Sequence, residues 1–246
     1  MTVGMGRHEE VASALTRVRA RLEAACREAG REPSEVALLP VTKFFPASDV
    51  RVLYDLGCRA FGESREPEAS TKVAEFSADP DVTEPVRWHM IGRLQRNKVK
   101  SVVRWADTVH SLDSGRLTDA LSGAVAAALD AGERSRAVEV LVQVSLDGDP
   151  SRGGVPVADL ESLADRVASA PGLELAGLMA VPPLGADPDA AFAQLHEVHA
   201  DLMRVHPGAG TLSAGMTGDL ESAVRHGSTC VRVGTALLGS RPIVSK

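Results

Sequence analysis

The sequence predicts an α/β fold: a single (β/α)₈ TIM barrel with an extra N-terminal helix, formed by one domain over residues 1–246. Three observations predict it. The chain has 246 residues, close to the ~250 typical of such barrels. Eight short apolar segments alternate with helical patterns, as expected for a parallel sheet covered on both faces. No internal repeat, low-complexity segment or long linker divides the chain.

The first element is a helix over about residues 7–30, because Val11, Leu15, Val18 and Leu22 share one helical face. Gly30 and Pro33 follow it and end the helical pattern. The eight strands are predicted at 36–43, 60–64, 87–92, 108–113, 138–146, 173–181, 211–215 and 229–234. Further helices are predicted around 50–56 and at 94–105, 116–131, 157–168 and 189–205, and 76–85 is predicted to be an exposed loop.

Composition limits the classes of function. The formal net charge of −6 gives no electrostatic reason to bind nucleic acid or an anionic membrane. Three cysteines without a CxxC spacing argue against a disulfide framework and a zinc site, and they suit a reducing compartment. The polar start, Met1–Glu10, lacks the apolar core of a signal peptide, and no apolar run approaches the ~18 residues of a membrane span. We therefore expect a cytoplasmic protein without a bound metal.

Lys43 is the first candidate for chemistry, because it alone among five lysines ends a predicted apolar strand. Active sites of these barrels lie at the carboxyl ends of the strands, where a lysine amine can form a Schiff base. The alternative interpretation is a salt-bridged or snorkelling lysine at the rim of the barrel. The other lysines, Lys72, Lys98, Lys100 and Lys246, are expected to be solvated. His89, within a strand, is expected to be a core residue.

Two glycine-rich segments near the C-terminus predict an anion site. Ser213-Ala-Gly215-Met216-Thr217 follows the seventh strand, and Gly234-Thr235 follows the eighth. Barrels of this class frequently bind phosphate between these two loops, through backbone N–H groups, hydroxyls and helix N-termini. Turn formation and helix capping would explain each loop separately, but they explain the pair less well.

Six segments carry a more specific resemblance. They are Pro40–Lys43, Phe61–Ser64, Trp88–Lys98, Gly177–Met179, Leu212–Thr217 and Gly227–Ala236. In this order they resemble the pyridoxal phosphate homeostasis protein family, whose members are fold-type-III barrels without the second domain of alanine racemase. The resemblance covers nearly the whole chain. The family usually has Asn where this chain has Ser64, which puts a polar contact from that position to the family's cofactor in doubt. Arg93 and Arg96 also occupy positions that other residues often hold in the family.

The resemblance implies that pyridoxal 5′-phosphate (PLP) is held as a Schiff base on Lys43. The other cofactor-binding positions it implies are Ser213, Gly215, Met216, Thr217, Gly234 and Thr235 around the phosphate, and Arg232 facing the pyridine nitrogen. It further implies a carrier role in vitamin B6 homeostasis without substantial turnover, no catalytic residue, a monomer, and PLP-dependent apoenzymes as partners.

Two alternatives stay open at this point. One is a slow PLP-dependent amino-acid racemase or lyase, and the other is a barrel that binds a phosphate ligand without PLP. Racemases of this fold use a tyrosine as the second base, but the single tyrosine, Tyr54, lies on the helix after Lys43 and is not placed to oppose it. Arg232 would also disfavour a protonated pyridine ring, which weakens the ring as an electron sink.

Overall fold

The structure, a computed structural model, describes residues 3–240, and it describes the side chains of 6–149 and 151–240. The predicted domain also includes residues 1–2 and 241–246, which lie outside the described residues. Eight strands of the described chain pair in parallel in the order β1-β9-β8-β7-β5-β4-β3-β2. A bridge between Val41 and Gly62 joins the two ends of this series, which closes the sheet. The predicted (β/α)₈ barrel is confirmed.

The strands are shorter than their predicted ranges. They are β1 (Ala37–Pro40), β2 (Ala60–Glu63), β3 (Arg87–Met90), β4 (Thr108–Leu112), β5 (Val138–Ser145), β7 (Leu173–Met179), β8 (Thr211–Ser213) and β9 (Cys230–Val233). A two-residue strand that was not predicted, β6 (Val155–Pro156), pairs with the end of β5 outside the barrel. The interpretation of eight barrel strands is therefore correct, and each strand is shorter than predicted by one to three residues at one end or at both.

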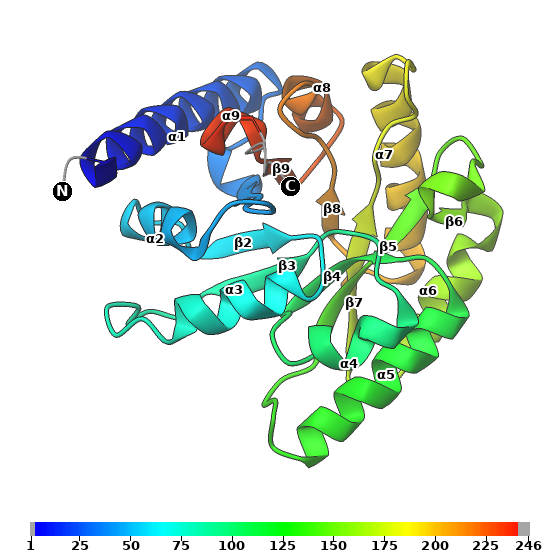
Figure 1. The fold of residues 1–246 in the computed structure, drawn as a ribbon. Helices are drawn as coiled ribbons and strands as arrows, with labels where there is room; N and C mark the ends of the chain where they lie inside the picture. Colours follow the sequence, from blue (N-terminus) through cyan, green and yellow to red (C-terminus); the bar gives the residue numbers. More distant parts are fainter. Residues whose placement is uncertain (1–2, 241–246) are drawn as a thin grey trace.

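Helices surround the barrel, and α1 lies along α8 and α9 (Figure 1). The α-helices are α1 (Val3–Glu28), α2 (Ala47–Asp55), α3 (Glu68–Ser77), α4 (Val99–Val102), α5 (Gly115–Asp130), α6 (Leu160–Ala168), α7 (Pro188–Val205), α8 (Leu220–Arg225) and α9 (Thr235–Leu238). Short 3₁₀ turns are η1 (Pro33–Glu35), η2 (Arg96–Lys98), η3 (Pro150–Arg152) and η4 (Val157–Asp159). None of the helices in the described part of the chain has the length and hydropathy of a membrane span.

Two helix predictions needed correction. The helix expected over 94–105 is reduced to η2 and the single turn α4. Helix α3 was not predicted, and it takes up the start of the expected 76–85 loop. Its buried face consists of Ala69, Lys72, Val73 and Phe76. A lysine therefore occupies a core-facing position of α3 and hides the apolar periodicity that would have revealed the helix.

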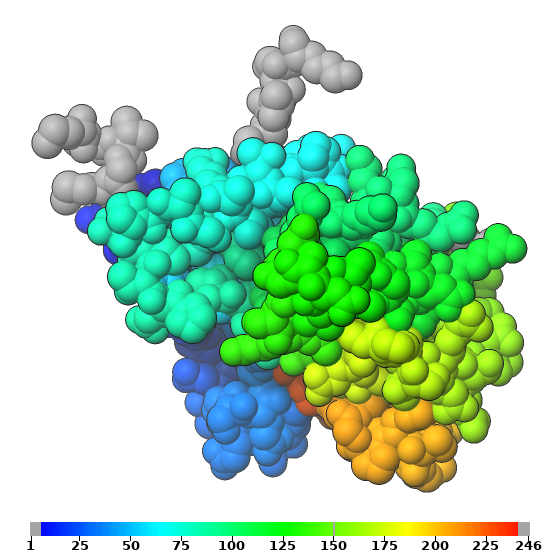
Figure 2. Space-filling model, turned by 90° about the horizontal axis from the view of Figure 1, so that it is seen from below, coloured from blue at the N-terminus to red at the C-terminus, as the bar shows by residue number. Residues whose placement is uncertain are grey.

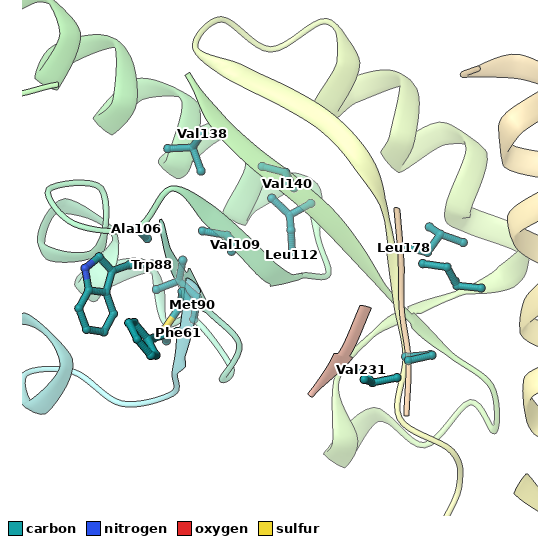
Figure 3. Packing of buried hydrophobic residues seen from close by; sticks show 14 of the residues in the cluster. Phe61, Trp88, Met90, Ala106, Val109, Leu112, Val138, Val140, Leu178 and Val231 are labelled. Carbon is teal, nitrogen blue, oxygen red and sulfur yellow. The ribbon is translucent and has the colours of Figure 1, made fainter. Parts of the chain in front are cut away.

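The main hydrophobic core lies between the strands and the helices. Its aromatic part joins Phe61 of β2 to Trp88 of β3, with ring centroids 5.5 Å apart, and Phe76 of α3 packs edge-on against both rings. Figure 3 shows Phe61, Trp88 and Met90 together on one side of the barrel, away from Leu178 and Val231. This layer packs β2 and β3 against α3, the helix that carries Lys72.

The barrel interior is filled by the opposite faces of the same strands. Leu39, Val41, Leu141, Met179 and Cys230 are buried but do not belong to the main cluster. Strand register places Arg232 beside Leu39 and Ser213 beside Met179. Since residues that pair in a parallel sheet point to the same side, Arg232 and Ser213 also point into the barrel. The interior is therefore partly polar.

The amino-terminal side of the barrel carries a polar hollow of ≈ 740 Å³ between the segment before β3 and the segment after α5. Figure 2 shows the molecule from below, with the segment before β3 in teal beside the green end of α5. Two ion pairs line it, Arg87 with Glu139 at 2.7 Å and Arg104 with Glu133 at 3.1 Å. We assign no ligand to this hollow, because four of its charged side chains form these two ion pairs and Arg134 donates to backbone carbonyls.

Candidate functional site

Lys43 lies at the carboxyl-terminal mouth of the barrel, in a turn just beyond the Val41 bridge. The Phe45 N–H donates to the Thr42 carbonyl at 3.1 Å, and Phe44 has a φ of +71°, so the chain turns sharply at Lys43. The side chain is exposed, with its Nζ 5.8 Å from the centroid of the Phe44 ring. An aldehyde arriving at the mouth can therefore reach the Lys43 amine.

A buried ionic cluster lies directly beneath this turn. Lys72 of α3 donates to the Thr42 carbonyl at 2.8 Å and to Glu63 Oε1 at 2.6 Å. The Thr42 hydroxyl donates to the same carboxylate oxygen at 2.6 Å. The side chains of Lys72 and Glu63 are 9% and 2% exposed. The prediction that Lys72 is solvated is wrong, because its ammonium is paired and holds the residue that precedes Lys43.

Gly234 and Thr235 lie beside the same strand end. The Val41 N–H donates to the Val233 carbonyl at 2.9 Å, which joins the ends of β1 and β9. A Cβ on Gly234 would lie 3.2 Å from the Val41 carbonyl oxygen, so a larger residue would have to shift the backbone after β1 by a few tenths of an ångström. Thr235 is exposed and begins α9. The Thr235 hydroxyl and the first backbone N–H groups of α9 therefore lie next to the Lys43 turn.

The loop after β8 forms the other side of this corner. Gly215 has a φ of +89°, and a Cβ there would lie 2.5 Å from the Ala223 Cβ, so the sharp turn requires glycine. The Gly215 carbonyl accepts from the Arg232 N–H at 2.9 Å. The Met216 N–H donates to Asp219 at 2.6 Å, and Arg21 of α1 donates to the Thr217 carbonyl at 2.7 Å. Helix α8 begins only at Leu220, after this loop.

Ser213 and Arg232 lie deeper, inside the barrel. Ser213 is fully buried and Arg232 is 5% exposed. Arg232 Nη1 donates to Ser213 Oγ at 2.7 Å, and Nη2 donates to the Ala180 carbonyl at 3.1 Å. Burial lowers the pKa of Arg232. No carboxylate is paired with Arg232 within the described residues. A buried cation without a counterion fits a ligand that offers an electron pair or negative charge.

Two histidines extend the polar contacts of Ser213 across the barrel. His110 Nδ1 lies 3.1 Å from Ser213 Oγ, and His110 Nε2 lies 2.9 Å from His89 Nδ1. Burial, the neighbouring His89 and Arg232 hold the pKa of His110 well below its usual value. Burial, followed by the charge of Arg87, lowers the pKa of His89 to about 4. Both imidazoles are therefore neutral near pH 7.

The structure thus groups the predicted site residues on the ends of three adjacent strands. Lys43 follows β1, Arg232, Gly234 and Thr235 lie on or after β9, and Ser213 ends β8 with the 215–217 loop behind it. The sequence interpretation missed His110, Thr42, Glu63 and Lys72. His110 could have been found, because it alternates with the outward-facing Val109 on a predicted strand next to that of His89.

Other groups with catalytic potential are engaged elsewhere. The Tyr54 hydroxyl accepts from the backbone N–H groups of Thr83 and Glu84, at 3.1 and 2.9 Å. It is therefore held under the loop before β3, away from the Lys43 turn. In the part of the chain that the structure describes, no group of three or more His, Cys, Asp or Glu side chains is arranged to hold a metal ion.

Comparison with known proteins places these features in a family. The model of the alanine racemase N-terminal domain matches residues 14–242. The pyridoxal phosphate homeostasis protein of Mycobacterium leprae is 53% identical over 240 residues, which cover 95% of this chain and 93% of its own. PipY of Synechococcus elongatus PCC7942 with PLP bound superposes with a TM-score of 0.76 and 31% identity, over 93% of this chain and 100% of PipY. The PipY structure without PLP superposes with a TM-score of 0.79 and 35% identity, again over 93% of this chain and 100% of PipY.

Proposed function

This chain belongs to the pyridoxal phosphate homeostasis protein family, and from that premise we propose that it binds PLP covalently and reversibly through Lys43. We further propose that it serves PLP homeostasis without substantial catalytic turnover, with PLP-dependent apoenzymes of the cytoplasm as recipients. The observation that carries the proposal is the position of Lys43. Its exposed amine stands at the barrel mouth beside the Gly234–Thr235 corner. Below it lies a buried arginine, Arg232, that has no carboxylate partner among the described side chains.

The residues present fit this cofactor. When bound, PLP supplies an aldehyde that condenses with an amine and a ring that withdraws electrons. Gly234 and Thr235 would hold its phosphate through backbone N–H groups and a hydroxyl, together with the loop Gly215-Met216-Thr217. Arg232 would face the ring nitrogen. Ser213, which the resemblance assigns to the phosphate, would instead hold Arg232 through the bond already present, because it is buried inside the barrel.

The wild-type protein provides the direct test. Purified protein loaded with PLP should be yellow, and borohydride reduction should fix a pyridoxyl group on the peptide that contains Lys43. Lys72 should stay unmodified, because its ammonium is buried and paired with Glu63. An adduct found mainly on Lys72, Lys98 or Lys100 would refute the assignment, and a colourless protein that takes up no PLP would refute the function.

Amino-acid racemisation is expected to stay near background. A two-base racemase needs an acid or base opposite the lysine, and the hydroxyl of the single tyrosine is bonded to two backbone N–H groups outside the mouth. Arg232 would also disfavour protonation of the pyridine nitrogen, which would weaken the ring as an electron sink for carbanion chemistry. Incubation of the PLP-loaded protein with L-alanine, followed by chiral chromatography, measures the rate. Turnover of about 1–10³ s⁻¹, as in ordinary enzymes, would contradict the carrier role.

Thr235→Ala is expected to weaken PLP binding about ten- to a hundredfold, because it removes one hydroxyl bond to a dianionic phosphate. Pyridoxal lacks the phosphate, so it should bind wild type and Thr235→Ala with similar affinity. Absorbance titration of both ligands into the cofactor-free protein gives the comparison. Thr16→Ala is the matched control, since Thr16 is exposed on α1 and its hydroxyl bonds only the Ala12 carbonyl. Equal losses for PLP and pyridoxal would show that Thr235 does not contact the phosphate.

A further inference from the structure

One direction is favoured for the hydrogen bonds inside the barrel. An arginine only donates, so Ser213 Oγ accepts from Arg232. The one hydroxyl proton of Ser213 is then free to donate, and His110 Nδ1 lies 3.1 Å away as a neutral acceptor. If Nδ1 accepts, His110 carries its proton on Nε2 and donates to His89 Nδ1 at 2.9 Å. The chain Arg232–Ser213–His110–His89 therefore links β9 to β3 through the barrel interior.

One other group could accept the Ser213 proton. Cys230 is the register partner of Ser213 on β9, and its thiol is buried there. Burial raises the pKa of this thiol, so the sulfur stays protonated and is a weak acceptor. The imidazole nitrogen of His110 is the stronger acceptor. When the Ser213 hydroxyl donates its proton to His110, a lone pair of Ser213 Oγ points to Arg232 and accepts from it.

From this chain of contacts we infer that His110 is a positioning residue for the cofactor ring: through the Ser213 hydroxyl it orients the Arg232 guanidinium toward the barrel mouth. The inference rests on the proposed function, because it assumes that PLP binds above Arg232. It deepens that proposal by assigning ring recognition to the barrel interior and phosphate recognition to the Gly234–Thr235 corner. The two parts of the site should then respond differently to pyridoxal, which has the ring but no phosphate.

The test compares two amide substitutions of His110. His110→Gln places its amide near the Nε2 position and loses the acceptor for Ser213, whereas His110→Asn keeps an amide oxygen near the Nδ1 position. We expect His110→Gln to weaken PLP and pyridoxal equally, by about three- to tenfold for one lost hydrogen bond. His110→Asn should restore most of the affinity for both ligands. Thr235→Ala, in contrast, should affect PLP alone.

Two further variants separate positioning from general destabilisation. His199→Gln replaces another buried histidine, which contacts the Ala209 carbonyl and takes no part in the Arg232–Ser213–His110–His89 series. This variant should leave the affinities for PLP and pyridoxal unchanged. Ser213→Ala should weaken both ligands, and adding His110→Gln to it should cost little more, because the contact is already broken. If His110→Gln binds PLP as wild type does, or if His110→Asn is no better than His110→Gln, the inference is wrong. If wild type itself binds no PLP, the proposed function fails instead.

Discussion

Lys43→Ala is expected to abolish covalent attachment of PLP while leaving the fold intact. No other lysine of the described chain combines an exposed amine with a place in the turn after β1: Lys72 is buried and paired, and Lys98 and Lys100 lie on η2 and α4. Because the Lys43 side chain is exposed and packs into no core, its removal should change the free energy of unfolding by less than about 0.5 kcal/mol. The visible band of the lysine-bound cofactor should disappear.

The measurement is an absorption spectrum with PLP, followed by borohydride reduction and peptide mass mapping. Lys100→Ala is the matched control, since it removes an exposed lysine of α4 and should keep the full adduct on Lys43. Lys43→Ala should still bind some PLP without a covalent link, through the phosphate corner and Arg232. A Lys43→Ala protein that retains a reducible adduct would show that another amine captures the cofactor.

The barrel could be predicted from sequence because its signal is local. Each strand is a short apolar run and most helices have an apolar stripe, so their number and order follow from hydrophobic patterns alone. The ends of the strands depend on contacts that patterns do not contain. The strand predicted to reach Lys43 has its last ladder residue at Pro40 with a bridge at Val41, because Phe44 adopts a positive φ and the Phe45 N–H bonds back to Thr42.

The candidate site was predicted in part for the same reason. Lys43, Gly215 and Gly234 stand in recognisable motifs at strand ends, and the structure places them on neighbouring strands. The supporting residues join segments far apart in the chain: His110 contacts Ser213, 103 positions away, and Lys72 contacts Thr42, 30 positions away. A polar side chain inside a barrel looks, in sequence, like one in solvent. The roles of His110 and Lys72 can therefore be inferred only when the packing of the strands and helices is known.

Lys72→Met is expected to produce the largest loss of stability. It leaves the Glu63 carboxylate, 2% exposed, without its cation, and it removes the bond to the Thr42 carbonyl. Breaking one partner of a buried ion pair costs about 3–5 kcal/mol, a large fraction of the total stability of a domain. Urea unfolding measures the loss. Arg104→Met is the control, because its pair with Glu133 is 68% and 47% exposed and should contribute at most about 1 kcal/mol.

The double variant Lys72→Met with Glu63→Gln makes the interpretation specific. Once the carboxylate is replaced by an amide, no uncompensated charge stays buried, and the Thr42 hydroxyl can still donate to the amide oxygen. The double variant should therefore be more stable than Lys72→Met alone, a non-additivity that is characteristic of direct contact. A simple packing role for Lys72 predicts the opposite, namely a loss at least as large as that of the single variant. Equal stability of Lys72→Met and Arg104→Met would show that the pair beneath Lys43 contributes no more than a surface pair does.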